Sequence, residues 1–209
     1  MKNVKNFLLL VALLATTIGF SFCDKTDDVP VQVTPAPTLS EAEINMLQFM
    51  REEEKLARDV YQHFYEKFGL NIFKNIKSSE QTHTDAVLTV MNQYHVPDIA
   101  ATEPGVFNIP ELQTLYNALI AQGDVSVTAA LTVGATVEDV DIRDLREGIS
   151  GTTNTDIVNM YQRLECASNN HLRSFTGNLS NYGVTYAPQF ISQALYEEII
   201  NGAHENCGQ

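Results

Sequence analysis

Apolar residues recur every three or four positions along most of this chain, which is the spacing of one face of an α-helix. Four long segments follow it, and each is bounded by a cap or a break. The sequence Ser40-Glu41-Ala42-Glu43 is a capping box that predicts the start of the first helix, and Gly69 predicts its end. The other three helices are predicted from about residue 71 to before Pro97, from about residue 126 to 150, and from about residue 156 to 180.

Two shorter helices are predicted at 111–122 and 188–201, and no alternating strand pattern of useful length occurs. Four long amphipathic helices indicate an all-α four-helix bundle. The connection between the second and third long helices is long and holds the 111–122 helix. This asymmetry favours the ferritin-like arrangement with one long crossover. We expect residues 40–201 to form the bundle and 202–209 to form a C-terminal tail.

The first 39 residues differ in composition from the rest. Lys2 and Lys5 precede an apolar run at 7–20, a pattern typical of a signal peptide over residues 1–22. Cys23 follows, and residues 23–39 form a polar and then proline-rich tether. The arrangement resembles a bacterial lipoprotein signal with Cys23 acylated. It predicts an exported cell-envelope lipoprotein on the periplasmic or outer-membrane side, and the alternative is a cleaved, soluble periplasmic protein.

Cys166 and Cys207 remain after Cys23 is set aside. In an oxidising compartment this pair suggests a disulfide, and the alternative is two free thiols. The formal net charge of the chain is −13. This argues against nucleic acid and against an anionic membrane surface as partners, so membrane contact is expected only through an N-terminal lipid anchor.

Polar residues interrupt the apolar stripes near the middle of each long helix. On the second helix the interruption is Glu80 and His83, one turn apart. On the first it is Glu54, with Glu53 as the alternative for the same inward position. At most two of residues 52–54 are expected to face inward, because an acidic run is usually a solvated face.

The third and fourth long helices carry the same kind of interruption. The third holds Glu138 and Asp141, whereas Asp139 and Asp144 are expected to face solvent. The fourth holds His171. Burying these acids without compensation would cost several kcal/mol per ion. Two divalent metal ions would neutralise them, and mixed carboxylate and imidazole ligands suit iron, with manganese or zinc possible. The alternative is a hydrogen-bonded core network without metal.

The order of these residues resembles the ligand order of ferritin-like di-iron proteins, and the block around Glu54 is similar to rubrerythrin. A closer similarity is to the prokaryotic domain-of-unknown-function family 2202 over about residues 40–200. It is carried by four blocks: 50–61 (MREEEKLARDVY), 79–87 (SEQTHTDAV), 141–145 (DIRDL) and 170–175 (NHLRSF). The resemblance implies a ferritin-like fold and no assigned activity. Di-iron proteins of the wider group carry a Glu where Ser168 stands here, and Asp141 could fill that place.

Three functions are compatible with these patterns. The first is a redox enzyme of the ferroxidase or peroxidase type that reacts with oxygen or peroxide. In it Glu54, His83, Glu138 and His171 would be terminal ligands, Glu80 would bridge, and Asp141 would bridge or shift. The second is a non-catalytic metal-binding lipoprotein. The third is an interaction module, which an exposed apolar patch at 106–109 would favour.

Overall fold

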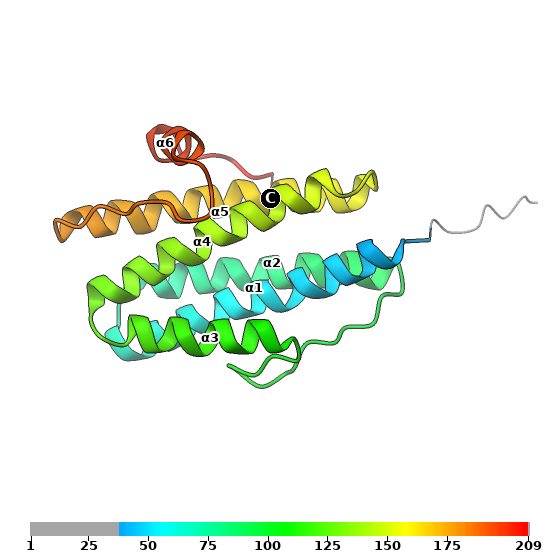
Figure 1. The fold of residues 1–209 in the computed structure, drawn as a ribbon, viewed down its shortest axis with the longest axis horizontal. Helices are drawn as coiled ribbons and strands as arrows, with labels where there is room; N and C mark the ends of the chain where they lie inside the picture. Colours follow the sequence, from blue (N-terminus) through cyan, green and yellow to red (C-terminus); the bar gives the residue numbers. More distant parts are fainter. Residues whose placement is uncertain (1–37, 209) are drawn as a thin grey trace, which may run out of the picture. The chain divides into compact units, whose positions relative to one another are not determined.

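Six helices run through residues 38–208, the part of the chain that the computed structural model describes, and no strand occurs among these residues. The helices are α1 (Glu41–Phe68), α2 (Asn71–Gln93), α3 (Pro110–Gly123), α4 (Val127–Ser150), α5 (Thr155–Asn181) and α6 (Gln193–Asn201) (Figure 1). The predicted signal peptide and the acylated Cys23 fall outside the described residues, as does nearly all of the tether.

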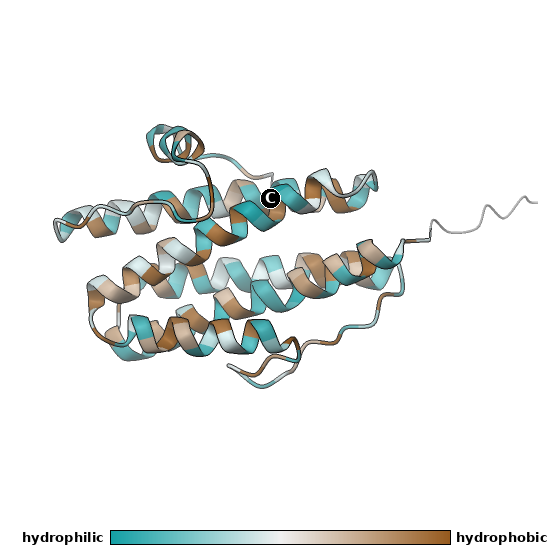
Figure 2. Cartoon of the chain, in the orientation of Figure 1, coloured by the Kyte–Doolittle hydropathy of each residue, from teal (hydrophilic) through white to brown (hydrophobic). Residues whose placement is uncertain are grey.

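The four long helices pair as the connection lengths predict. α1 packs mainly against α2 and α4 mainly against α5, and α2 also packs against α5 (Figure 1). The long crossover carries α3, which packs on both α1 and α4. This confirms the predicted all-α bundle with one long connection and short accessory helices. Figure 2 shows apolar positions recurring along the long helices, as the stripes require.

The sequence signals at the ends of α1 have the expected geometry. Ser40 Oγ accepts a hydrogen bond from the amide of Glu43, and a carboxylate oxygen of Glu43 accepts one from the amide of Ser40. Gly69 lies in the left-handed region at φ 70°, which a glycine adopts without steric cost. The predicted start and end of α1 are therefore confirmed.

The last helix begins later than predicted, at Gln193 instead of residue 188. The cause is Asp139, which is fully buried and not solvent-facing as predicted. Its carboxylate accepts hydrogen bonds from the amides of Gln189, Phe190 and Ile191 at 2.6–3.2 Å. Those amides are therefore held toward a side chain of α4, and residues 189–191 form a bend instead of a helical turn until Ser192 caps α6.

α1 is buried on more of its faces than a typical bundle helix, which leaves one face in solvent. Glu52, Glu53 and Glu54 are all at least 95% buried, so the expectation that at most two would face inward is wrong. The reason is the crossover. Glu52 accepts the amides of Asn108 and Ile109, both at 2.8 Å, just before α3 begins.

Lys55 continues this contact with the crossover. Its ammonium group lies 2.7 Å from Asp59 and donates to two backbone carbonyls of the crossover, those of Glu103 and Val106. The same ammonium group lies 4.4 Å from the centre of the Phe107 ring. A buried Lys is tolerated here because each donor direction finds an acceptor.

Aromatic rings fill the bundle beside its polar centre. Phe175 of α5 packs against Tyr61 and Phe73, with ring centroids 5.2 and 5.7 Å apart. The ring of Phe175 also lies directly over Gly134 of α4, where an added Cβ would come within 2.3 Å of it. Gly134 is one turn before Glu138. The close packing of α4 against α5 at Gly134 therefore limits the distance between the Glu138 side chain and α5.

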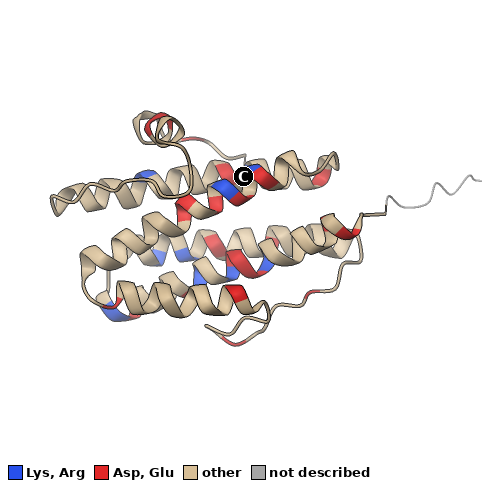
Figure 3. Cartoon of the chain, in the orientation of Figure 1, with Lys and Arg blue, Asp and Glu red and all other residues tan. Residues whose placement is uncertain are grey.

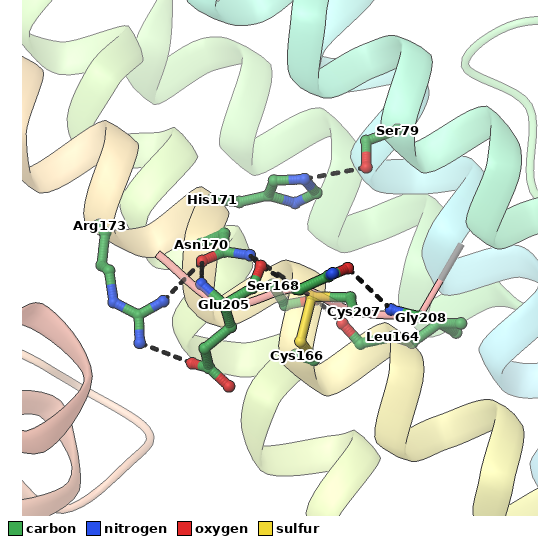
Figure 4. The surroundings of a disulfide bond; sticks show 11 residues. Ser79, Leu164, Cys166, Ser168, Asn170, His171, Arg173, Glu205, Cys207 and Gly208 are labelled. Carbon is green, nitrogen blue, oxygen red and sulfur yellow. Dashed lines mark hydrogen bonds and ion pairs between the residues drawn. A yellow bond between two sulfur atoms is a disulfide. The ribbon is translucent and has the colours of Figure 1, made fainter. Parts of the chain in front are cut away.

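The C-terminal tail is fixed to α5 and does not hang free of it. Cys166 and Cys207 form a disulfide with an S–S distance of 2.11 Å (Figure 4). Asn170 forms two hydrogen bonds with the backbone of Glu205, and Arg173 pairs with the Glu205 carboxylate at 2.6 Å. Among the six described helices, none combines the length and apolar character needed to span a membrane.

Candidate metal centre

Five of the predicted ligands meet in the interior of the bundle, where the four long helices face one another. Each is at least 92% buried: Glu54 from α1, Glu80 and His83 from α2, Glu138 from α4 and His171 from α5. Figure 3 shows acidic positions near the middle of these helices. Carboxylate and imidazole groups at this depth need a partner, because burial of an uncompensated charge costs several kcal/mol.

The first group of ligand atoms is built on His83. Its Nδ1 atom lies 3.2 Å from a carboxylate oxygen of Glu54 and 2.9 Å from Oε2 of Glu80. The Glu-x-x-His spacing places the last two side chains on one face of α2, and Glu54 faces them from α1. The ligand atoms of this group all lie within 4.8 Å of one another, a spacing at which one metal ion could bind all three residues.

The second group is built on His171 in the same manner. Its Nδ1 atom lies 2.9 Å from Oε1 of Glu80 and 3.3 Å from Oε2 of Glu138, and these ligand atoms again lie within 4.8 Å. Glu80 therefore belongs to both groups, with one oxygen toward each histidine. The His83 and His171 rings lie nearly parallel, with centroids 5.5 Å apart and planes at 22°.

Several carboxylate oxygens in this region are buried without a hydrogen-bond partner. They are Oε1 of Glu54, Oε1 of Glu80 and Oδ1 of Asp141. His171 Nδ1 is close to Oε1 of Glu80 but does not align its N–H bond with it. Buried oxygens of this kind are rare in folded proteins and cost about 1–3 kcal/mol each. Several such oxygens in one region are typical of a cation-binding site whose ligands are already in position.

The charges of the site are strongly coupled. Burial lowers the pKa of His171, but the nearby charges of Glu138 and Glu80 outweigh it and raise the pKa to about 10. Burial also opposes a charged His83, and Glu80 and Glu54 raise its pKa well above the ordinary value. Glu80 resists ionisation through burial, yet the two imidazolium groups hold its pKa well below its usual range.

The remaining acids are held toward their neutral forms. Burial raises the pKa of Glu54 to about 7, against the favourable charge of His83. Burial likewise raises the pKa of Glu138. The pKa of Asp141 is raised well above its ordinary value by burial and by the charges of Glu54 and Glu138. Without a cation, the site therefore balances its acids with protons.

A second set of side chains fixes the orientation of these ligands. Tyr61 Oη donates a 2.5 Å hydrogen bond to Oε1 of Glu138, leaving Oε2 to face His171. Ser79 Oγ lies 3.0 Å from Nε2 of His171, so the far nitrogen of that ring is engaged and Nδ1 is directed inward (Figure 4). Such outer contacts tune metal ligands as well as orient them.

The sequence matches the family profile described as uncharacterized protein domain DUF2202 over residues 43–203. The chain belongs to the DUF2202 family. It is 49% identical over 172 residues to the uncharacterized protein MJ0754 of Methanocaldococcus jannaschii, covering 82% of this chain and 93% of that protein. The crystal structure of hypothetical protein MJ0754 from Methanococcus jannaschii DSM 2661 is similar to it, with a TM-score of 0.80, and the match covers 82% of this chain and 98% of that one.

The two remaining predicted ligands of this DUF2202 protein lie beside the two groups. Asp141 belongs to neither group, and its Oδ2 accepts a 2.5 Å hydrogen bond from Ser168. Glu53 is also buried, but the charges that act on it come mainly from Asp144 and Asp141. Of the two alternatives on α1, Glu54 is therefore the one that faces His83.

The sequence also indicates a missing ligand at Ser168, because related di-iron proteins have a Glu at that position. The structure gives each group two carboxylates and one imidazole without a residue at that position, because Glu80 is shared. Ser79 was missed as a contributor. It precedes Glu80 on the flank of the α2 stripe, so helical periodicity gives no signal for it, and only the position of α5 brings His171 within reach.

Proposed function

We propose that this DUF2202 protein binds two divalent metal ions, iron first among them, between α1, α2, α4 and α5. The observation that carries the proposal is the shared Glu80, whose two oxygens face two imidazole nitrogens within separate groups of close ligand atoms. The donor set fits, since carboxylates with imidazoles suit iron and manganese, and zinc accepts them too. Unpartnered buried oxygens on Glu54 and Glu80 support the same assignment.

Each residue has a distinct part in this proposal. Glu54 and His83 would hold one ion, Glu138 and His171 would hold the other, and Glu80 would be shared by both. Tyr61 restrains Glu138, and Ser79 restrains His171. Asp141, one turn after Glu138 on α4 and hydrogen-bonded to Ser168, would be an additional carboxylate beside the two groups. This is the carboxylate-rich arrangement that supports di-iron chemistry in helical bundles.

We further propose that the centre is a ferroxidase. When two ferrous ions are bound they supply one electron each to dioxygen, in the balance 2 Fe²⁺ + O₂ + 2 H⁺ → 2 Fe³⁺ + H₂O₂. The shared Glu80 would keep the two ions in neighbouring positions, and the buried carboxyl groups of Glu54 and Asp141, whose pKa values burial raises, would carry protons. A binding protein without turnover would have the same ligands and would leave dioxygen unreduced.

The third possibility, an interaction module presenting an apolar patch at 106–109, has no support in the structure. Phe107, the largest side chain of that segment, is 6% exposed and packs against Tyr116 and Lys55. Among the apolar residues of that segment, only Val106 is well exposed. The crossover thus uses its apolar residues to cover α1 rather than to present them.

Substitution of two adjacent glutamates on α1 tests the metal assignment. We expect Glu54→Gln to lower metal content by about one ion per chain, because it removes a charged ligand from the His83 group only. Glu53→Gln is the matched control: it removes a buried carboxylate one residue away, and metal content should stay unchanged. Elemental analysis of protein expressed with added iron gives the measurement. Equal metal content in both variants and in the unsubstituted protein would refute the assignment.

We also propose that the protein is exported and anchored through an acylated Cys23. The signal-like N-terminus motivates this, and the Cys166–Cys207 disulfide supports it, since such bonds persist mainly in oxidising compartments. The expected product begins at Cys23 and carries lipid, and it sediments with membranes. Mass spectrometry of the protein isolated from cell membranes checks this. A Cys23→Ala variant that keeps the same membrane association would rule out the anchor.

A further inference from the structure

A narrow apolar cavity of about 30 Å³ lies between α1, α3 and α4, beside the candidate metal centre. Its walls include Leu56 of α1, Leu119 of α3 and Val137 of α4, all buried. Its outer side is lined by Val140, which is partly exposed, and Phe190, which is 40% exposed. The lining therefore includes residues at the surface of the molecule.

Two buried carboxyl groups, those of Glu53 and Asp141, also line the cavity. One oxygen of each, Oε2 of Glu53 and Oδ1 of Asp141, has no hydrogen-bond partner. Glu53 directly precedes Glu54 on α1, and Asp141 follows Glu138 by one turn on α4, so both acids adjoin candidate ligands. The lining of the cavity thus includes partly exposed side chains and residues next to the proposed ligands.

A second hollow reaches the centre from the opposite pair of helices. It measures about 410 Å³, lies between α2, α5 and the C-terminal tail, and exposes Ser79, His171 and Glu205 (Figure 4). Most of its lining residues carry polar side chains, with which ions and hydrogen-bonding molecules can interact. The centre is therefore approached by one polar route and one apolar route, and the two routes share no residue.

We propose that the cavity between α1, α3 and α4 is the passage by which dioxygen reaches the metal centre, which rests on the ferroxidase function proposed above. A cavity of about 30 Å³ has room for one small molecule such as dioxygen. Its walls offer almost no hydrogen-bond partner before Glu53 and Asp141, so water and hydrogen peroxide would lose hydrogen bonds on entering, whereas dioxygen has none to lose. The same dimensions exclude organic substrates.

Two readouts test the passage. In crystals of the protein as purified, pressurised with xenon, we expect xenon between Leu56, Leu119 and Val137, because xenon enters apolar cavities. Val140→Phe should fill the outer end and exclude it, and Leu119→Phe should do the same from α3. In the iron-loaded protein, both substitutions should slow oxidation of Fe²⁺ by dioxygen at least about tenfold. Val140→Ala is the matched control and should slow nothing.

Peroxide provides an internal comparison in the same variants. Oxidation by hydrogen peroxide should keep its rate in Val140→Phe, since the polar hollow beside His171 is untouched. The passage is refuted if xenon stays out of the unsubstituted protein, if Val140→Phe oxidises at the original rate with dioxygen, or if both oxidants slow equally. Failure of the unsubstituted protein to bind iron would instead overturn the proposed function, and metal analysis separates that outcome from the others.

Discussion

Replacing Glu80 with glutamine is expected to remove both metal ions, lowering the content from about two per chain to almost none. Oε2 of Glu80 faces His83 and Oε1 faces His171, each at 2.9 Å. Glutamine keeps one oxygen and no charge, so neither group of ligand atoms retains its shared carboxylate. Glu54→Gln, by contrast, affects only the His83 group. The difference between two ions lost and one ion lost is specific to a bridging position.

The same substitution should also destabilise the metal-free protein. Glu80 is the carboxylate that both imidazolium groups share, and removing one partner of a buried charged pair typically costs about 3–5 kcal/mol. Asp85→Asn, on the exposed side of the same helix, is the matched control and should change neither metal content nor stability. Circular dichroism before metal analysis separates loss of ligands from loss of fold. Retention of one ion by Glu80→Gln would show that Glu80 does not bridge.

The sequence predicts the helices well because their signals are local. The capping box at Ser40 and the left-handed glycine at Gly69 act within one turn, and the apolar stripes set which face is buried. Glu80 and His83 could be singled out for the same reason, since both break a stripe whose other members are apolar. The DUF2202 resemblance, given by the blocks around these residues, is confirmed by the family match over residues 43–203.

The errors have a common physical origin, which is coverage by segments distant in the sequence. Asp139 and Glu52 fall off the main stripes, so helical phase places them in solvent. Both are buried because irregular segments lie over them: the segment before α6 covers Asp139, and the crossover covers Glu52. The spacing of apolar residues predicts which helix faces pack against other long helices. It does not predict which loop amides will need a carboxylate as a hydrogen-bond acceptor.

The same limit applies to the prediction of the candidate site. Six of the seven proposed metal-binding or alternative positions lie on stripes, yet the structure separates Glu54 from Glu53 and leaves Asp141 outside both groups of ligand atoms. That distinction depends on how α1, α2 and α4 are rotated about their axes relative to one another, which the sequence does not specify. The sharing of Glu80 between two histidines follows only once α5 is placed against α2.

The protonation of the histidines has a consequence for stability without metal. The folded-state pKa of His171 is raised to about 10, above the ordinary value of 6.5, by the charges of Glu138 and Glu80, which outweigh burial. A raised pKa contributes stability that is fully present below pH 6.5 and is lost as the pH rises through 10. His83 shifts in the same direction. Glu80 acts in the opposite direction, because its pKa is lowered. Its contribution to stability is present at pH values above the ordinary pKa of a glutamate and is lost in acid.

The metal-free protein should therefore be most stable in mildly acidic solution and lose stability in base. For His171 alone, the loss between pH 7 and pH 9 is about 3 kcal/mol, and His83 adds to it. The metal-loaded protein should not show this decline, because imidazoles bound to metal carry no proton at Nδ1. Thermal melting of chelator-treated and metal-loaded samples at both pH values measures the contrast.

A surface histidine makes the control for this contrast. His63, which pairs with Asp124 and is about one-third exposed, lies far along α1 from the centre, so His63→Asn should keep the full alkaline loss. His171→Asn should remove a large part of it, because the proton that is retained on folding is then absent. A chelator-treated protein that melts at the same temperature at pH 7 and pH 9 would show that protons do not balance the buried acids. The case for cations as their natural partners would then weaken, since that case depends on the same unpaired charge.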